Sequence, residues 1–206
     1  MMNVILLSKQ LRDGEAISEY TKNIAEELVE EGHGATIISF DDGSYYSIDD
    51  RVEVIRFPLH FDGDNIYNWA MMMNNEMKGK VISLMEDEDF DLIHANDWTT
   101  VPGAVVLSKH TEKPLITTIH STENERGFSG DHAEMISELE WQGTYESDHV
   151  LVTKEDTKNS VLFDLDVPED KVDVIDPLSG GWQERVLNKY REVVNHKKQA
   201  EKEVKN

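Results

Sequence analysis

Apolar residues gather in seven short, continuous runs along the chain, separated by longer and mostly polar stretches. An uninterrupted apolar run is typical of a strand that is covered on both faces of a sheet, whereas a half-exposed strand alternates apolar with polar residues. The runs therefore predict buried strands at Asn3–Ser8, Ala35–Phe40, Val52–Phe57, Asp91–Ala95, Leu115–His120, His149–Thr153 and Val172–Ile175.

The stretches between these runs carry apolar residues at spacings of three and four, which gather on one side of a helix. One such stripe comprises Ile17, Tyr20, Ile24 and Leu28, and a longer one comprises Ile66, Trp69, Met73, Met77, Val81 and Leu84. Asp13 and Asp64 are the expected N-caps of these two helices, and Gly32 and Gly34 flank the exit of the first. Further helices are predicted near Thr100–Lys109, near His132–Glu146 after a cap at Asp131, and near Glu155–Phe163. Alternation of strands and helices at this rhythm predicts an α/β fold with a doubly wound parallel sheet.

The end of the chain departs from this alternation. Residues 176–181 are rich in turn formers, and Ser179–Gly181 has the composition of a short linker. A last helical stripe follows, comprising Trp182, Val186, Tyr190 and Val193. Residues Lys197–Asn206 are almost all polar, so the end of this helix is expected to fray. We therefore divide the chain into a domain at 1–178, a linker at 179–181, and a C-terminal helix with a polar tail at 182–206.

Composition narrows the classes of function. A length of 206 residues fits one domain. The 42 acidic and 20 basic residues give a net charge of −22, and such a surface repels phosphate backbones and anionic lipids, so we expect no nucleic-acid partner and no membrane role. The sequence has no long apolar segment, no signal-peptide pattern and no cysteine. It therefore predicts a cytoplasmic protein without disulfides or thiolate metal sites.

Candidate chemistry lies in the loops after the predicted strands, because ligands of doubly wound sheets bind at the carboxyl ends of the strands. Four such loops carry polar residues: Lys9–Glu15, His94–Trp98, His120–Arg126 and Lys154–Thr157. In the first loop, Gly14 lets the backbone approach a ligand closely, and the helix start behind it offers free amides to an anion. The sequence has neither a GxGxxG motif nor a P-loop motif, so an ordinary strand-to-helix turn explains this loop at least as well.

Asp97 and His120 are the candidate catalytic residues of these loops. Asp97 can accept hydrogen bonds from sugar hydroxyls or orient an imidazole, and it can equally cap the helix that follows. A single histidine at a strand end, such as His120, is more often a hydrogen-bonded structural group than a catalyst. Trp98 taken alone is more typical of a core than of a sugar platform. The spacing of the acidic and histidine residues within 131–134 matches no standard set of metal ligands, so no metal site is predicted.

Six motifs follow one another along the chain: Arg12-Asp13-Gly14-Glu15, Ile17-Ser18-Glu19-Tyr20, Glu30-Glu31-Gly32-His33, His94-x-x-Asp97-Trp98, Thr118-Ile119-His120 and Glu146-Ser147-Asp148-His149-Val150. In this order they resemble the N-terminal domain of glycogen-synthase-like retaining glycosyltransferases, which have the B-type (GT-B) fold of two Rossmann-like domains. The resemblance covers about Met1 to Ile175. It implies the acceptor-side domain of an enzyme that transfers a hexose from a nucleotide-diphosphate sugar to a glycan acceptor, without a separate cofactor.

The resemblance also implies roles for single residues. These are Arg12 and Gly14 at the donor diphosphate, His120 near the anomeric carbon, Asp97 near the sugars, and His94 and Trp98 as further substrate-binding residues. Two positions depart from the family's pattern, since Glu15 replaces a second glycine and Asn96 replaces the second histidine of its HxHDW motif. A carboxylate at Glu15 would repel a neighbouring diphosphate.

The family continues beyond a strand like Val172–Ile175 into a second domain that grips the donor. Here a turn and a helix that resembles the family's final helix follow instead, so we expect the second domain to be absent and this chain to be inactive alone. The surface that the second domain would cover is then a possible homodimer interface. Two alternatives are a one-domain module that binds a carbohydrate or a protein, and a receiver-like regulator. The latter needs an acidic cluster after the first strand, which Ser8-Lys9-Gln10 does not supply.

Overall fold

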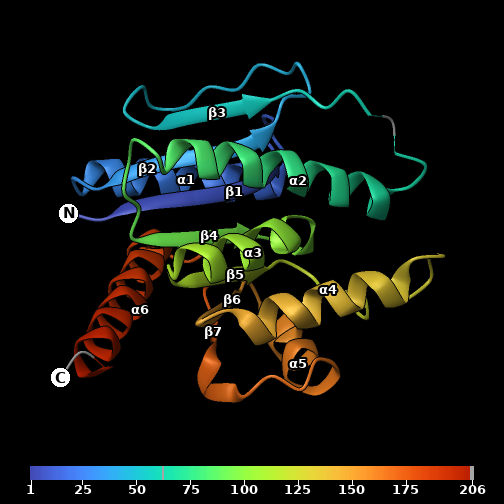
Figure 1. Ribbon diagram of the computed structural model, residues 1–206. Coiled ribbons are helices and arrows are strands. Elements are labelled where there is room, and N and C mark those ends of the chain that lie inside the picture. Colours follow the sequence, from blue (N-terminus) through green and yellow to red (C-terminus); the bar gives the residue numbers. More distant parts are fainter. Residues whose placement is uncertain (62, 205–206) are drawn as a thin grey trace.

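The computed structural model describes residues 1–61 and 63–204, and seven strands of this part of the chain form one parallel sheet (Figure 1). The strands are β1 (Asn3–Gln10), β2 (Gly34–Phe40), β3 (Glu53–Phe57), β4 (Leu92–Asn96), β5 (Leu115–Ile119), β6 (His149–Val152) and β7 (Val172–Val174). Their order across the sheet is β3-β2-β1-β4-β5-β6-β7, and every neighbouring pair is parallel. The order reverses between β1 and β4, so the prediction of a doubly wound, Rossmann-like sheet is confirmed.

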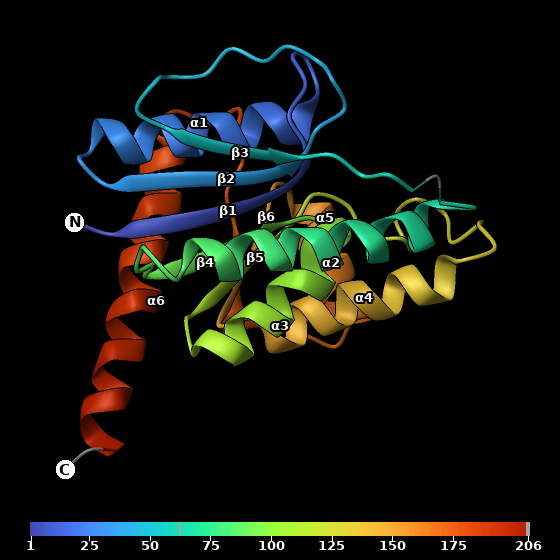
Figure 2. The same ribbon diagram turned by 45° about the horizontal axis from the view of Figure 1, so that its top comes forward.

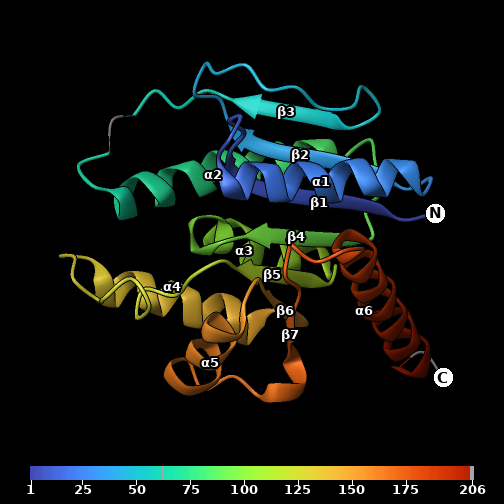
Figure 3. The ribbon, with the colours of Figure 1, turned by 180° about the vertical axis from the view of Figure 1, so that it is seen from behind.

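Six α-helices connect or follow these strands within the described residues. They are α1 (Ala16–Glu30), α2 (Ile66–Leu84), α3 (Val101–Thr111), α4 (Ala133–Glu146), α5 (Glu155–Asp164) and α6 (Trp182–Val204), with 3-10 turns at Trp98–Thr100 and Glu169–Lys171. Helices α2 and α3 cover one face of the sheet (Figure 1), and α1 and α6 cover the other, as the view from behind shows (Figure 3).

The continuous apolar runs predicted these two layers, because successive residues of a strand point to opposite faces. On β1, Leu6 packs among the residues of α1 and α6, whereas Leu7 packs among those of α2 and α3, and both are fully buried. The same division holds on β2 for Ile37 and Ile38. The strands β1 and β2 thus contribute to both cores.

The helix caps differ from those predicted, and Asp13, Asp64 and Asp131 do not serve as N-caps. Helix α1 is capped by Glu15, whose carboxylate accepts hydrogen bonds from the backbone N–H of Ile17 (3.3 Å) and Ser18 (2.7 Å). Asp13 lies too early because the backbone turns at Gly14, where φ is +75°. Helix α2 is capped by Asn65, one residue after the predicted Asp64, and α4 begins after His132, whose side chain makes no cap bond to the described backbone.

The Glu15 cap allows a direct test against the predicted one. Glu15→Ala should lower the free energy of unfolding by about 1 kcal/mol, because two backbone donors lose their acceptor. Asp13→Ala serves as the matched control and should change it by less than about 0.5 kcal/mol. Urea unfolding followed by circular dichroism measures both, and equal losses in the two variants would contradict the assignment of the cap.

The C-terminal helix packs back on the domain, as predicted. The ring of Trp182 stacks on Tyr20 of α1, with ring centroids 4.9 Å apart, and Tyr190 is fully buried beneath the sheet. The expected fraying from Lys197 onward is not seen as far as Val204, where the described part of α6 ends, and residues 205–206 of that prediction lie outside the described residues. An ion pair across the domain, between Lys198 Nζ and Asp91 Oδ1 at 2.8 Å, anchors this polar end.

Candidate functional site

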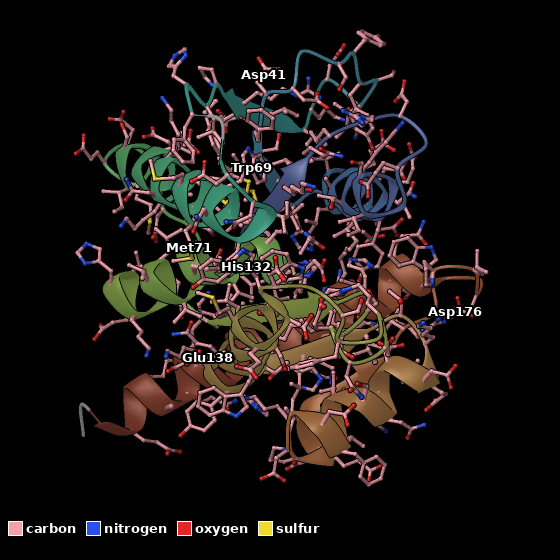
Figure 4. The ribbon with its side chains drawn as sticks, turned by 90° about the vertical axis from the view of Figure 1, so that its right-hand side faces the viewer. Asp41, Trp69, Met71, His132, Glu138 and Asp176 are labelled. Atoms are coloured by element: carbon pink, nitrogen blue, oxygen red, sulfur yellow. The ribbon has the colours of Figure 1, made fainter. Side chains whose placement is uncertain are left out.

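The carboxyl ends of the strands meet at one edge of the sheet, which Figure 4 shows end-on. The first turns of α2 and α4 project beyond this edge (Figure 2), and the rings of Tyr67 and His132 stack between them with centroids 6.0 Å apart. A cavity of about 260 Å³ opens here. Its walls are residues 8–10 of β1, the start of α1 with Glu15, the start of α2, and residues 97–99 after β4.

Asp97 stands in this cavity with an unusual backbone. Its φ of 65° and ψ of 166° fall in a region that is otherwise almost restricted to glycine, which costs about 1–3 kcal/mol. The side chain is only 9% exposed, and its Oδ1 atom has no hydrogen-bond partner among the described residues. Burial raises the pKa of Asp97 to about 6, against an opposing effect of the Arg126 charge. Asp97 also holds the N-cap position of the turn at Trp98–Thr100, as the alternative interpretation predicted, although its side chain makes no capping hydrogen bond there.

His120 follows β5 and lies beside Asp97 along the edge. The backbone N–H of Asp97 donates to the carbonyl of Thr118 at 2.8 Å, which fixes the two strand ends together. The His120 ring meets Tyr20 edge-on with centroids 4.8 Å apart, and its buried Nε2 atom has no partner in the described part of the chain. Burial lowers the pKa of His120 to about 4, so the imidazole is neutral at physiological pH.

Unpartnered buried polar atoms are concentrated at this edge. Among the described residues there are four such side-chain atoms, namely Ser39 Oγ, Asn96 Oδ1, Asp97 Oδ1 and His120 Nε2. Ser39 lies one residue before the end of β2, and the other three lie at or just after the ends of β4 and β5. Buried polar atoms are normally paired with hydrogen-bond partners. A group of unpaired ones at the carboxyl ends of the strands therefore indicates a surface that binds the polar groups of a ligand.

The two residues predicted for a diphosphate are already paired within the chain. The Arg12 guanidinium holds Asp42 with Nη2 and Nε at 2.7 and 3.1 Å from Oδ2, and it does not line the cavity. The Gly14 N–H points to Glu19 Oε1 at 3.4 Å. The loop from Arg12 to Gly14 therefore reaches the predicted edge, but its polar groups are turned to other parts of the domain.

His94 and Trp98 are less accessible than the resemblance implies. His94 is fully buried in the layer of α1 and α6, where Nδ1 bonds to the Tyr190 hydroxyl and Nε2 to Thr118 Oγ1 at 2.7 Å. Both ring nitrogens are thus engaged inside the protein. Trp98 borders the cavity but is only 6% exposed and packs with residues of α2 and α4.

The sequence names the loop His120–Arg126 as a candidate but does not single out Glu140 of α4, which helps to hold this loop in place. Every N–H group of Arg126 donates a hydrogen bond. Nε and Nη2 donate to Glu123, and Nη2 also donates to Glu140 at 2.7 Å. Nη1 donates to the carbonyl and to the hydroxyl of Ser121. Glu140 is fully buried on α4 and also accepts from the Glu123 backbone N–H. Burial raises the pKa of Glu140 to about 7. The signal in the sequence is that Glu140 lies on the apolar side of a predicted helix, where a carboxylate is unusual.

Among the described residues, no group of three or more histidine, aspartate or glutamate side chains is arranged to hold a metal ion. Likewise, no helix in this part of the chain has the length and hydropathy needed to cross a bilayer.

A sequence model of the family described as Glycosyltransferase Family 4 matches residues 17–177. The chain belongs to this family. A glycosyltransferase of Methanocaldococcus jannaschii is 32% identical over 187 residues, which are 87% of this chain and 46% of the relative. A glycogen synthase of Mycobacterium tuberculosis is 24% identical over 72% of this chain and 41% of its own length. The chain thus spans about half the length of these curated relatives.

Solved structures share the fold at low sequence identity. Sucrose-phosphate synthase from Thermosynechococcus elongatus superposes with a TM-score of 0.69 and 15% identity, over 85% of this chain and 48% of that one. A second structure of an enzyme with the same name has a TM-score of 0.66 and 16% identity. The match covers 93% of this chain and 97% of that one. An Anabaena protein solved with UDP and glucose reaches a TM-score of 0.60 at 15% identity, over 85% of this chain and 44% of that one. This family member therefore has the Rossmann-like fold of a B-type glycosyltransferase domain.

Proposed function

We propose that this domain forms the acceptor side of a cleft in which a hexose is transferred, with retention, from a nucleotide-diphosphate sugar to a glycan. The observation that carries the proposal is the strained and buried Asp97, whose Oδ1 is unpartnered among the described residues at the edge where this fold binds ligands. The Anabaena neighbour solved with UDP and glucose supports a nucleotide-sugar as donor.

In this proposal Asp97 and His120 act on the sugars. Above pH 6 Asp97 is ionised and accepts a hydrogen bond from a sugar hydroxyl, which orients the acceptor. His120 stays neutral, and its Nε2 can form a hydrogen bond to a hydroxyl close to the reacting carbon without adding a charge. Stabilisation of the leaving diphosphate by cationic groups and amides supplies most of the catalysis in such transfers. The resemblance implies that a second domain supplies most of the grip on the donor, so the 206 residues alone should bind acceptor but not turn over.

The proposal is tested with the purified chain, common nucleotide-sugars and glycan acceptors. We expect NMR shift changes at Asp97 and His120 on addition of a glycan, and no steady release of product. Continuous turnover would contradict the expected inactivity of these residues on their own. A chain whose amides near residues 97 and 120 respond to no glycan would overturn the acceptor site itself. If the chain binds a glycan but binds no nucleotide, a carbohydrate-binding module is favoured instead.

A further inference from the structure

The structure shows that the groups expected to bind phosphate on this domain are occupied. The first turn of α1 would be an anion site through its free N–H groups, but the Glu15 carboxylate fills it, bonding to the N–H groups of Ile17 and Ser18 and to the Ser18 hydroxyl at 2.6 Å. Arg12 is held by Asp42. A substrate anion would have to displace a carboxylate at either place.

A different cation stands at the centre of the same edge. Lys9 lies near the end of β1 and lines the cavity of Asp97. It also lines an adjoining cavity of about 420 Å³, whose other walls are Gln10, Phe40, Gly63, Asn65, and Ile66 and Trp69 of the first turn of α2. Lys9 is thus the cation shared by both cavities, and Figure 4 shows Trp69 on the edge where they open.

The Lys9 ammonium faces an aromatic ring, and its charge also acts on the nearby Asp97 carboxyl group. Its Nζ lies 5.5 Å from the centroid of the Trp69 ring, and the Trp69 ring in turn meets Phe40 edge-on at 5.3 Å. Within the described residues no carboxylate lies close enough to Nζ for a salt bridge. An aromatic face attracts a cation but leaves its N–H groups free to bond to an anion.

The net charge of the whole chain disfavours an anionic substrate, which a local cation would offset. With a net charge of −22, the protein as a whole repels anions. The other charged groups on the cavity walls are Glu15 and Asp97, and Glu15 is engaged by the backbone of α1. Lys9 is therefore the group on these walls that can attract an oxyanion at short range.

We propose that Lys9, positioned by Trp69, binds an oxyanion of the substrate in place of Arg12 and the start of α1. The oxyanion is either the phosphate of a nucleotide-sugar or the carboxylate of an acidic sugar in the acceptor. This inference rests on the proposed function, because it names the residue of the same cleft that meets the charged part of a substrate.

The experiment compares three charge removals in the full chain. Lys9→Met keeps the apolar stem of the side chain, Arg12→Met removes the cation paired with Asp42, and Lys22→Met is a matched control. Lys22 also holds its Nζ 5.5 Å from an aromatic ring, that of Tyr46, but does not line either cavity. The ligands are UDP, inorganic pyrophosphate, a disaccharide containing glucuronic acid, and a neutral disaccharide, with dissociation constants from NMR titration. Lys9→Gln is a second variant for the case that Lys9→Met does not fold.

We expect Lys9→Met to weaken binding of one anionic ligand class by about tenfold or more, because a hydrogen bond to a charged group is lost. Arg12→Met and Lys22→Met should change it by less than about twofold. Selective loss of UDP and pyrophosphate identifies the donor phosphate as the partner, and selective loss of the acidic disaccharide identifies the acceptor. Binding of the neutral disaccharide should be retained.

Four results would overturn the inference. A loss in Arg12→Met but not in Lys9→Met returns the anion site to the β1–α1 loop and leaves the proposed function intact. Equal losses in Lys9→Met and Lys22→Met show that only the net charge matters. If the unaltered chain binds the neutral disaccharide but none of the anionic ligands, the Lys9 site is refuted and the proposed function is not. Failure of every ligand to bind refutes the proposed function as well.

Discussion

Tyr190→Ala should lower the free energy of unfolding by about 3–5 kcal/mol, the range for removal of a buried aromatic side chain. Tyr190 of α6 is fully buried, and its ring meets that of His94 at a centroid distance of 5.5 Å. Its hydroxyl bonds to His94 Nδ1, and His94 Nε2 bonds to Thr118. The substitution therefore opens a cavity under the sheet and also leaves a buried imidazole nitrogen without its partner.

Two further variants separate these causes. Tyr190→Phe keeps the ring and removes only the hydroxyl, so it should cost about 1–3 kcal/mol, the penalty for an unsatisfied buried group. Tyr145→Ala is the matched control, because Tyr145 is 64% exposed on α4 and should lose less than about 1 kcal/mol. Urea unfolding measures all three. A loss of less than about 1 kcal/mol in Tyr190→Ala would mean that α6 is not part of the cooperative unit.

The strands could be predicted from the sequence because burial on both faces leaves a simple signal. The predicted and observed strands agree within two residues, with β1 extending to Gln10 and β5 ending at Ile119. The N-caps could not be predicted with the same success. Asp13 was preferred by residue type, but the turn at Gly14 places Glu15, which is rarely a cap, over the free N–H groups of α1.

The candidate site was predicted only in part, for a geometric reason. The sequence places Asp97 and His120 at strand ends, and parallel strands bring these ends together. It does not say which face of a strand a side chain takes. His94 and Asn96 lie two residues apart on β4 and therefore share a face, which the structure shows to be the one covered by α1 and α6. The pairing of Arg12 with Asp42 joins residues 30 positions apart and leaves no local trace in the sequence.

The same limit applies to Lys9. In the sequence it is one polar residue in a loop, and its importance depends on Trp69 and Asp97, which lie far from it along the chain. Only the structure shows that Lys9 faces an aromatic ring, while Arg12, the cation of the resembling motif, faces the carboxylate of Asp42. A resemblance transfers the position of a loop more safely than the role of each residue in it.

Asp97→Asn should stabilise the protein while weakening its binding of a glycan. Burial raises the pKa of Asp97 to about 6, from an ordinary value of 3.8. A raised pKa of an acid means that the folded state binds the proton more tightly than the unfolded state. The ionised carboxylate therefore lowers the free energy of unfolding. This loss reaches its full size above pH 6 and disappears below the pKa of the unfolded state. The neutral amide removes this penalty, so the variant should gain about 1–3 kcal/mol near pH 8 and about half as much near pH 5.

Comparison of the variant with the unaltered chain at each pH cancels the titration of the other groups, which both proteins share. Asp97→Gly adds a second test, since glycine adopts the φ of +65° without strain, and it too should stabilise the fold. Binding moves in the opposite direction: a neutral amide in place of a charged acceptor should weaken a glycan by about tenfold or more in an NMR titration. A structural role for Asp97 predicts the reverse pattern, with stability lost and glycan binding kept. A residue that costs stability and is needed for a ligand is one that the fold holds under strain for that ligand.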